Sequence, residues 1–243
     1  MGALDGKHVA IRCPKNGRSL YFNYKGFHSI GLMALVDVDY KFIWVKVGAN
    51  GASSDTQIFN NSELKAAMED GAIDFLVPDP LPTDDRHMPY FILCDNAFAL
   101  RTWLMKPCSK RNMTEDERIF NYRISRGLRV MENAFGIMAN KFQCLLTTLR
   151  QQPKTVESIV LACVCLHNIM RIRYPGLQNA ALDQEDNEHR LIPGAWRQGR
   201  NMADVDNVVC GNRLTRAAKA QREYLKHYFN SEAVAVPWQN AMI

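Results

Sequence analysis

The segment at residues 89–98, PYFILCDNAF, constrains the fold of this chain more than any other. A run of four apolar residues and a cysteine is typical of a strand buried on both faces, as in a parallel sheet. The run ends in Asp95, whose carboxylate loses its hydration when it is buried. A second strand-like run, ALDGKHVAIRC at residues 3–13, is interrupted in the same way by Asp5. Two predicted core strands therefore each carry a carboxylate.

The remaining patterns predict the order of the elements. Alternation of apolar and polar residues indicates strands, whereas apolar residues three and four apart indicate helices. Strands are predicted over residues 3–13, 23–38, 40–51 and 90–98, and helices over residues 53–71, 114–145 and 154–173. The short turn DVDYK predicts an antiparallel hairpin. This order favours an α/β fold with a mixed sheet, in which three antiparallel strands are continued by parallel ones and helices cover both faces.

The same patterns divide the chain into three parts. Residues 1–173 form one predicted domain, and no internal repeat is visible in the sequence. Residues 174–211 lose periodicity, and we expect a loose tail there. Residues 212–230 are predicted to form an amphipathic helix.

Composition excludes some classes of protein. The longest apolar run, at residues 159–166, is far shorter than the ~20 residues that span a bilayer, so no membrane partner is expected. The odd number of cysteines, seven, favours free thiols in a reducing compartment. Residues 51–100 hold nine acidic and two basic residues, and residues 101–152 hold ten basic and four acidic ones. This asymmetry suits a metal site that handles polyanions, and it suits solvated faces of mixed sign equally well.

Asp5 and Asp95 can meet if their strands are neighbours in the sheet. Two carboxylates in contact repel one another unless a cation neutralises them. Oxygen ligands without a nearby Cys–His set favour Mg²⁺ or Mn²⁺ over zinc. The best third ligand is Glu132, because it interrupts the apolar face of RVMENAFG. We therefore expect Asp5, Asp95 and Glu132 to converge on a common point.

The chain also resembles a known family. The resemblance lies in six segments that occur in order between residues 1 and 173: LDGKHVAI, YKGFHSI, GASSDTQIFNNSEL, ILCDNAFALRTWLMKP, FNYRISRGLRVMENAFGIMANKF and LACVCLHNIM. Together they resemble the Harbinger transposase-derived nucleases, the PIF/Harbinger group of the DDE superfamily. The resemblance implies an RNase H-like core in which Asp5, Asp95 and Glu132 are the catalytic acids.

The resemblance also implies roles for two further residues. Asp55, in SSDTQIF, matches a further acidic position of the divalent-metal site, although the sequence alone reads it equally well as a helix cap. His8 matches a strand-borne histidine of the family, which suits either the orientation of a phosphate or carboxylate or a structural hydrogen bond.

The implied activity is cleavage of DNA phosphodiester bonds by a two-metal in-line mechanism, in the nucleus and also in the cytoplasm. Arginines before Glu132 are candidates for contacts with the DNA backbone, or else form a solvated helix face; they are Arg118, Arg123, Arg126 and Arg129. The alternative function is a non-catalytic domesticated transposase domain that serves as a DNA- or protein-binding scaffold.

Members of the family carry a helical region with helix-turn-helix-like character before the first acidic strand. This sequence starts four residues before Asp5. We therefore expect sequence-specific DNA binding to be weak or to be supplied by a separate partner protein.

Two cysteine motifs offer competing chemistry. In CVCLHN, only Cys163 and His167 are four residues apart and can share a helix face, so packed core residues are favoured over a zinc site. Cys94 precedes Asp95 with no histidine partner indicated, which favours a buried side chain over a nucleophile.

Overall fold

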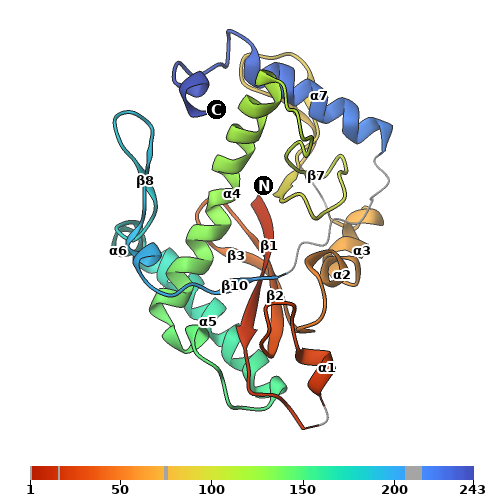
Figure 1. The fold of residues 1–243 in the computed structure, drawn as a ribbon. Coiled ribbons are helices and arrows are strands. Elements are labelled where there is room, and N and C mark those ends of the chain that lie inside the picture. Colours follow the sequence, from red (N-terminus) through yellow and green to blue (C-terminus); the bar gives the residue numbers. More distant parts are fainter. Residues whose placement is uncertain (1, 16, 74–75, 206–214) are drawn as a thin grey trace.

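The computed structural model describes residues 2–15, 17–73, 76–205 and 215–243 (Figure 1). Its first three strands are β1 (Gly2–Ala10), β2 (Ser29–Val36) and β3 (Phe42–Asn50), with the short helix α1 (Arg18–Tyr21) between β1 and β2. Both pairs of neighbours, β1 with β2 and β2 with β3, are antiparallel. The predicted hairpin turns at Tyr40, whose φ of 63° places it in the left-handed region.

Strand β1 lies in the middle of the sheet. The strand order is β3-β2-β1-β6-β7, where β6 is Ile92–Cys94 and β7 is Leu104–Met105. Both β6 and β7 run parallel to the strand before them in this order. The mixed sheet expected from the sequence is therefore confirmed. The apolar run at residues 89–98 yields only three strand residues, because the chain turns away from the sheet at Asp95.

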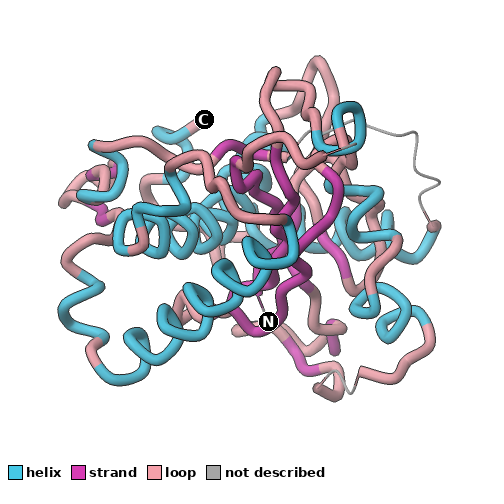
Figure 2. Tube along the Cα trace, turned by 90° about the horizontal axis from the view of Figure 1, so that it is seen from below, coloured by secondary structure: helices cyan, strands magenta, loops and turns pink. Residues whose placement is uncertain are grey.

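Helices cover both faces of the sheet, which Figure 2 shows as a central group of strands between helices. On one face, α4 (Glu115–Lys141) and α5 (Pro153–Arg173) pack on Ala3 and Val9 of β1. On the other face, α2 (Asp55–Asn60) and α3 (Glu63–Glu69) pack on Leu4. The single helix predicted at residues 53–71 is two helices, because Ser62 caps α3 through Lys65 N.

Residues 174–205, where the sequence predicts a loose tail, contain short helices and strands. These elements are α6 (Pro175–Asn179), β8 (Gln184–Glu185), β9 (Leu191–Ile192), η2 (Ala195–Gln198) and β10 (Ala203–Asp204). We call residues 183–205 the strap, because they run across α4 and end in β10, which pairs with β1 (Figure 1). Residues 206–214 lie outside the described residues. The predicted amphipathic helix follows as α7 (Arg216–Asn230).

The remaining short elements lie at the periphery. The proline-rich segment at residues 77–89 contains a small hairpin of β4 (Asp79–Pro80) and β5 (His87–Met88). The 3-10 helix η1 (Gln143–Leu146) follows α4, and η3 (Gln239–Met242) follows α7. Helix α7 packs its buried Ala218 and Leu225 against Phe120 and Ile124 of α4, forming a separate apolar cluster.

The strap is anchored on α4 by tertiary contacts. Trp196, buried with 5% exposure, lies over Gly136, where a Cβ atom would stand 2.1 Å from the indole ring. The indole Nε1 donates a hydrogen bond of 2.9 Å to Asn133 Oδ1, which also accepts from the backbone N of Asp183 at 2.9 Å. These contacts join residues more than 45 positions apart. The local sequence pattern of the strap therefore does not reveal them.

Helix α5 is the one described helix that is long and apolar enough to cross a membrane by length and composition. Its polar residues are docked on the β2–β3 hairpin. His167 Nε2 lies 2.8 Å from Tyr40 O. The Asn168 side-chain amide accepts from Phe42 N and donates to Phe42 O, both at 2.9 Å. Arg171 Nε donates to Asp39 O at 2.9 Å. These contacts hold one side of α5 against the sheet, whereas Leu161, Leu166, Ile169 and Ile172 on the helix are exposed.

We predict that Gly136→Ala destabilises the protein, because the added methyl group overlaps the ring of Trp196. Overpacking of this kind costs about 1–3 kcal/mol of unfolding free energy. The matched control is Gly176→Ala, since nothing lies within 4 Å of that position, and it should change stability by less than about 0.5 kcal/mol. Urea unfolding measures both. Equal stabilities of the two variants would mean that the strap does not contribute to folding.

Candidate metal centre

The candidate site lies at a gap along one edge of β1. On this edge, residues 2–4 pair with β6 and residues 7–8 pair with β10, so Asp5 and Gly6 fall between the two partners. The register Leu4↔Cys94 brings Asp95, the next residue after β6, beside Asp5. From the other side, Val205 N donates to Gly6 O at 3.3 Å. The fold thus brings together acidic residues that are 90 positions apart in the sequence.

Asp55 reaches the same gap from the N-terminus of α2. The helix cap is Ser54, whose Oγ accepts from Gln57 N at 3.3 Å and whose N donates to Gln57 Oε1 at 3.0 Å. The Asp55 carboxylate is therefore not needed for capping. It lies against Gly6, where an added Cβ would be 1.8 Å from Oδ1. Asp55 is 1% exposed, and neither carboxylate oxygen has a hydrogen-bond partner in the part of the chain that the structure describes.

The three aspartates form one electrostatic cluster. Burial and, after it, the nearby carboxylates of Asp5 and Asp95 raise the pKa of Asp55 to about 9. Burial also raises the pKa of Asp95 to about 6, against the lowering effect of its hydrogen bond from Ala97. The pKa of Asp5 is raised by burial as well, although the neighbouring Lys7 lowers it. A cation placed here would therefore stabilise all three carboxylates.

Hydrogen bonds fix the loop that carries Asp95. Asp95 Oδ1 accepts from Ala97 N at 3.0 Å, and Thr56 Oγ1 in α2 donates to Ala97 O at 3.0 Å. Buried Lys106 donates to the backbone oxygens of Asn96 and Phe98 at 3.0 and 2.7 Å. Since Thr56 follows Asp55 directly, the same contacts hold Asp95 and Asp55 at one end of the sheet.

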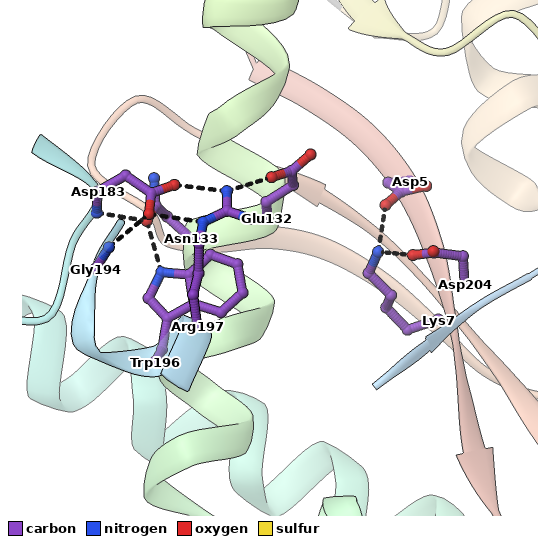
Figure 3. A network of polar contacts seen from close by, with 9 residues as sticks. All are labelled: Asp5, Lys7, Glu132, Asn133, Asp183, Gly194, Trp196, Arg197 and Asp204. Atoms are coloured by element: carbon purple, nitrogen blue, oxygen red, sulfur yellow. Dashed lines mark hydrogen bonds and ion pairs between the residues drawn. The ribbon is translucent and has the colours of Figure 1, made fainter. Parts of the chain in front are cut away.

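Lys7 lies on the other flank of Asp5 (Figure 3). Its Nζ is 3.0 Å from Asp5 Oδ2 and also forms a hydrogen-bonded ion pair with Asp204 of β10. The lysine is buried, with 8% exposure. Burial alone would lower its pKa, but Asp5 and Asp204 together raise it. The ammonium group is thus a fixed positive charge within the acidic cluster.

Glu132, on α4, has a different partner. Its Oε2 lies 2.5 Å from Nη2 of Arg197 in the strap (Figure 3). The same guanidinium donates from Nε and Nη2 to the two carboxylate oxygens of Asp183, at 2.8 and 2.7 Å. The Glu132 side chain is 49% exposed. It lines a pocket of about 230 Å³ together with Lys7, Trp196 and Asp204. Glu132 therefore faces the lysine side of the site.

The convergence expected for Asp5, Asp95 and Glu132 is not observed. Among the residues that the structure describes, no three His, Cys, Asp or Glu side chains are arranged to hold a metal ion. The physical reason is that two internal cations, Lys7 and Arg197, already neutralise Asp5 and Glu132. Asp55, without such a partner, is the carboxylate whose chemistry best fits an oxygen-bound divalent ion.

His8 occupies the opposite side of β1 from Asp5 and Lys7, because side chains alternate along a strand. Its Nδ1 lies 2.9 Å from Ser29 Oγ, which in turn accepts from Asn23 Nδ2 at 2.9 Å. The ring also packs edge-on against Phe27. This arrangement favours the structural alternative for His8 over an orienting role.

Three of the four candidate arginines contact the C-terminal part of the chain. Arg126 and Arg129 bind the two oxygens of Glu185 at 2.7 and 2.8 Å, and Arg123 lies over the ring of Phe229 at 4.9 Å. Arg118 is exposed on the first turns of α4. Contact with DNA by these arginines stays a prediction.

Cys94, Cys163 and His167 of the two cysteine motifs are buried, whereas Cys165 is exposed. His167 is hydrogen-bonded to Tyr40, and burial lowers its pKa to about 4, so it is a neutral core histidine. Cys163 is buried among the apolar residues under α5. Burial raises the pKa of Cys94 well above that of a free thiol. A thiol of raised pKa is a poor nucleophile.

Sequence reasoning missed four charged residues at this site: Lys7, Lys106, Asp204 and Arg197. For Lys7 there was a signal, because it stands two positions after Asp5 and so shares its face of the strand. Asp204 and Arg197 lie in the strap, where the sequence has no periodicity to predict a placement.

Comparison with known proteins identifies the class of this fold and site. The family model described as "DDE superfamily endonuclease" matches residues 4–168. The chain therefore belongs to the DDE superfamily endonucleases, and its mixed sheet is the RNase H-like core of that family. No solved structure matches the chain.

Curated relatives narrow the relationship. The chain is 30% identical over 172 residues to "Putative nuclease HARBI1" of Xenopus laevis and of Homo sapiens, which covers 70% of this chain and 45% of each relative. It is 24% identical over 173 residues to "Protein ALP1-like" of Arabidopsis thaliana, covering 70% of this chain and 42% of that protein. The chain thus spans less than half the length of these relatives. The Harbinger-derived origin expected from the sequence is confirmed.

The buried carboxylate of Asp55 predicts a pH dependence of stability in the absence of divalent metal. The pKa of Asp55 is about 9 in the folded protein, whereas that of a free aspartate is about 4. Stability from this group is therefore complete below about pH 4 and is lost as the pH rises to about 9. We expect a loss of roughly 1 kcal/mol per pH unit within this window.

The measurement is urea unfolding at pH 5 and pH 8 with a chelator present. Asp55→Asn should flatten the pH dependence, whereas Asp70→Asn, at the exposed end of α3, should leave it unchanged. Identical pH profiles for wild type and Asp55→Asn would contradict the placement of this carboxylate in the acidic cluster.

Proposed function

We propose that this protein is a divalent-metal-dependent nuclease of transposase origin that cleaves DNA phosphodiester bonds. The observation that carries the proposal is the buried Asp55 carboxylate beside Asp5 and Asp95, with no hydrogen-bond partner for either oxygen among the described residues. Burying such a group is unfavourable unless a cation or a proton neutralises it. The membership of the chain in an endonuclease family agrees with a cation.

In this proposal Asp55 is a ligand of the metal, Mg²⁺ or Mn²⁺, and Asp5, Asp95 and Glu132 are the catalytic acids that the resemblance implies. Divalent ions held by carboxylates can activate a water molecule and stabilise the departing 3′ oxygen of an in-line displacement. The protein's own contribution is to preorganise the ligands. The sheet carries Asp5, the end of β6 carries Asp95, and the Ser54 cap fixes the backbone before Asp55.

The partner in this proposal is DNA. Arg118 and its neighbours on α4 supply positive charge for the sugar–phosphate backbone, which contributes affinity without sequence preference. Sequence preference would come from a separate DNA-binding partner protein. We place the activity in the nucleus, and also in the cytoplasm, on the resemblance described above.

A second candidate function is a non-catalytic scaffold that binds DNA or protein. It is favoured by the two internal ion pairs, Lys7–Asp5 and Arg197–Glu132, which occupy carboxylates that an enzyme would present to metal. The Asp55 oxygens, which have no hydrogen-bond partner among the described residues, favour the nuclease, because a scaffold gains nothing from burying such a group against β1.

Cleavage of supercoiled plasmid in Mg²⁺ or Mn²⁺ tests the proposal. Asp95→Asn should lower the rate by at least about a hundredfold, since even residues that support metal ligands contribute 10–100-fold. The matched control, Asp70→Asn, removes an exposed carboxylate far from β6 in the sequence and should cleave like wild type. Equal rates for wild type and Asp95→Asn, or no cleavage with either metal, would reject the nuclease and favour the scaffold.

A further inference from the structure

Helix α5 carries exposed apolar residues along one side. We call them the α5 stripe, and they are Leu161, Ala162, Cys165, Leu166, Ile169 and Ile172. The leucine and isoleucine side chains among them are 43–68% exposed. The six positions recur every three or four residues along the helix, so they share one side of it. The stripe is therefore continuous over about 17 Å of helix.

The opposite side of α5 is already occupied. Val156, Val160 and Cys163 are buried in the core under the helix, and His167 is held by Tyr40 O in the β2–β3 hairpin. The helix is thus fixed on the sheet with its stripe turned outward. Single exposed apolar side chains are ordinary, whereas a continuous apolar patch marks a surface that contacts another molecule.

Charged residues stand at both ends of the stripe. Before it lie Lys154 and Glu157, whose side chains form an ion pair of 3.2 Å, and directly after it lies the exposed Arg173. If two copies of α5 paired in parallel, Lys154 would face Lys154 and Arg173 would face Arg173, and like charges repel. Antiparallel pairing brings Arg173 of each copy to the level of Glu157 of the other. The charges therefore favour an antiparallel pair.

The stripe is also self-complementary about Cys165. Leu161 and Ile169 each lie four positions from Cys165, and Glu157 and Arg173 each lie eight positions from it. A twofold axis at Cys165 therefore sets Leu161 of one copy against Ile169 of the other and brings the two Cys165 side chains together. Such a contact is isologous, as in most protein dimers. The small side chains at its centre let the two helices approach closely.

We propose that the α5 stripe is the interface of a twofold dimer, in which α5 of a second copy of this chain packs antiparallel on it with Cys165 at the axis. The dimer goes beyond the nuclease function proposed above and does not depend on it. The burial of apolar side chains from both copies drives the association, and the charges at the ends of the stripe set its direction.

Sedimentation equilibrium of the 243-residue protein under reducing conditions, over a wide range of concentration, tests the proposal. We expect a monomer–dimer equilibrium in wild type. Leu161→Asp should raise its dissociation constant at least about a hundredfold, because the carboxylate enters the apolar contact once from each copy. The matched control is Val77→Asp, an 83% exposed apolar residue outside the stripe, which should dimerise like wild type.

Thiol cross-linking tests the position of the axis. Bismaleimidoethane, a short reagent that joins two thiols, should produce a covalent dimer from wild type and none from Cys165→Ser. Cys13→Ser is the matched control, since Cys13 is also an exposed free cysteine but lies far from the stripe in the sequence. This control variant should cross-link like wild type.

Three results would overturn the proposal. They are a monomer at every concentration, a folded Leu161→Asp that dimerises like wild type, and a covalent dimer that forms equally well in Cys165→Ser. If circular dichroism shows that Leu161→Asp is unfolded, Ile172→Asp is measured in its place, because Ile172 is 68% exposed and lies in the same stripe. None of these results bears on plasmid cleavage, so the nuclease proposal is tested separately.

Discussion

Repulsion among carboxylates that the fold buries around β1 is the constraint on which the rest of the site depends. Besides burial, the carboxylates of Asp5 and Asp95 raise the pKa of Asp55, and that of Asp5 raises the pKa of Asp95. A protein can meet this cost with protons, with its own cations or with metal ions. This protein uses its own cations on the α4 side, where Lys7 and Arg197 stand, whereas the oxygens of buried Asp55 have no hydrogen-bond partner among the described residues.

The strap links this electrostatic problem to the fold. It delivers Arg197 to Glu132 and Asp204 to Lys7, and it is anchored on α4 through Trp196. Asn133 and Gly136, which follow Glu132 in the sequence ENAFG, serve this anchoring: the first accepts the indole hydrogen bond and the second leaves room for the ring. Part of the sequence around the predicted catalytic glutamate is therefore explained by packing.

Much of the sheet was predictable, because alternation and buried runs leave strong signals. The antiparallel hairpin, the parallel pairing of β6 with β1 and the proximity of Asp95 to Asp5 all follow from such patterns. Asp55 could be assigned to the acidic group only through family resemblance, since a residue at a helix start reads equally well as a cap. The partner of Glu132 was not predictable, because Arg197 lies 65 residues away in a segment whose structure depends on tertiary contacts.

The most direct measurement of the central claim is thermal unfolding at pH 8 with and without saturating Mn²⁺. An ion that binds only the folded protein at about 100 times its Kd adds about 2.7 kcal/mol, which raises the Tm of a domain of this size by about 5–10 °C. The account predicts this increase for wild type and its loss in Asp55→Asn. An unchanged wild-type Tm, or an equal increase in Asp55→Asn, would contradict a cation-dependent cluster at β1.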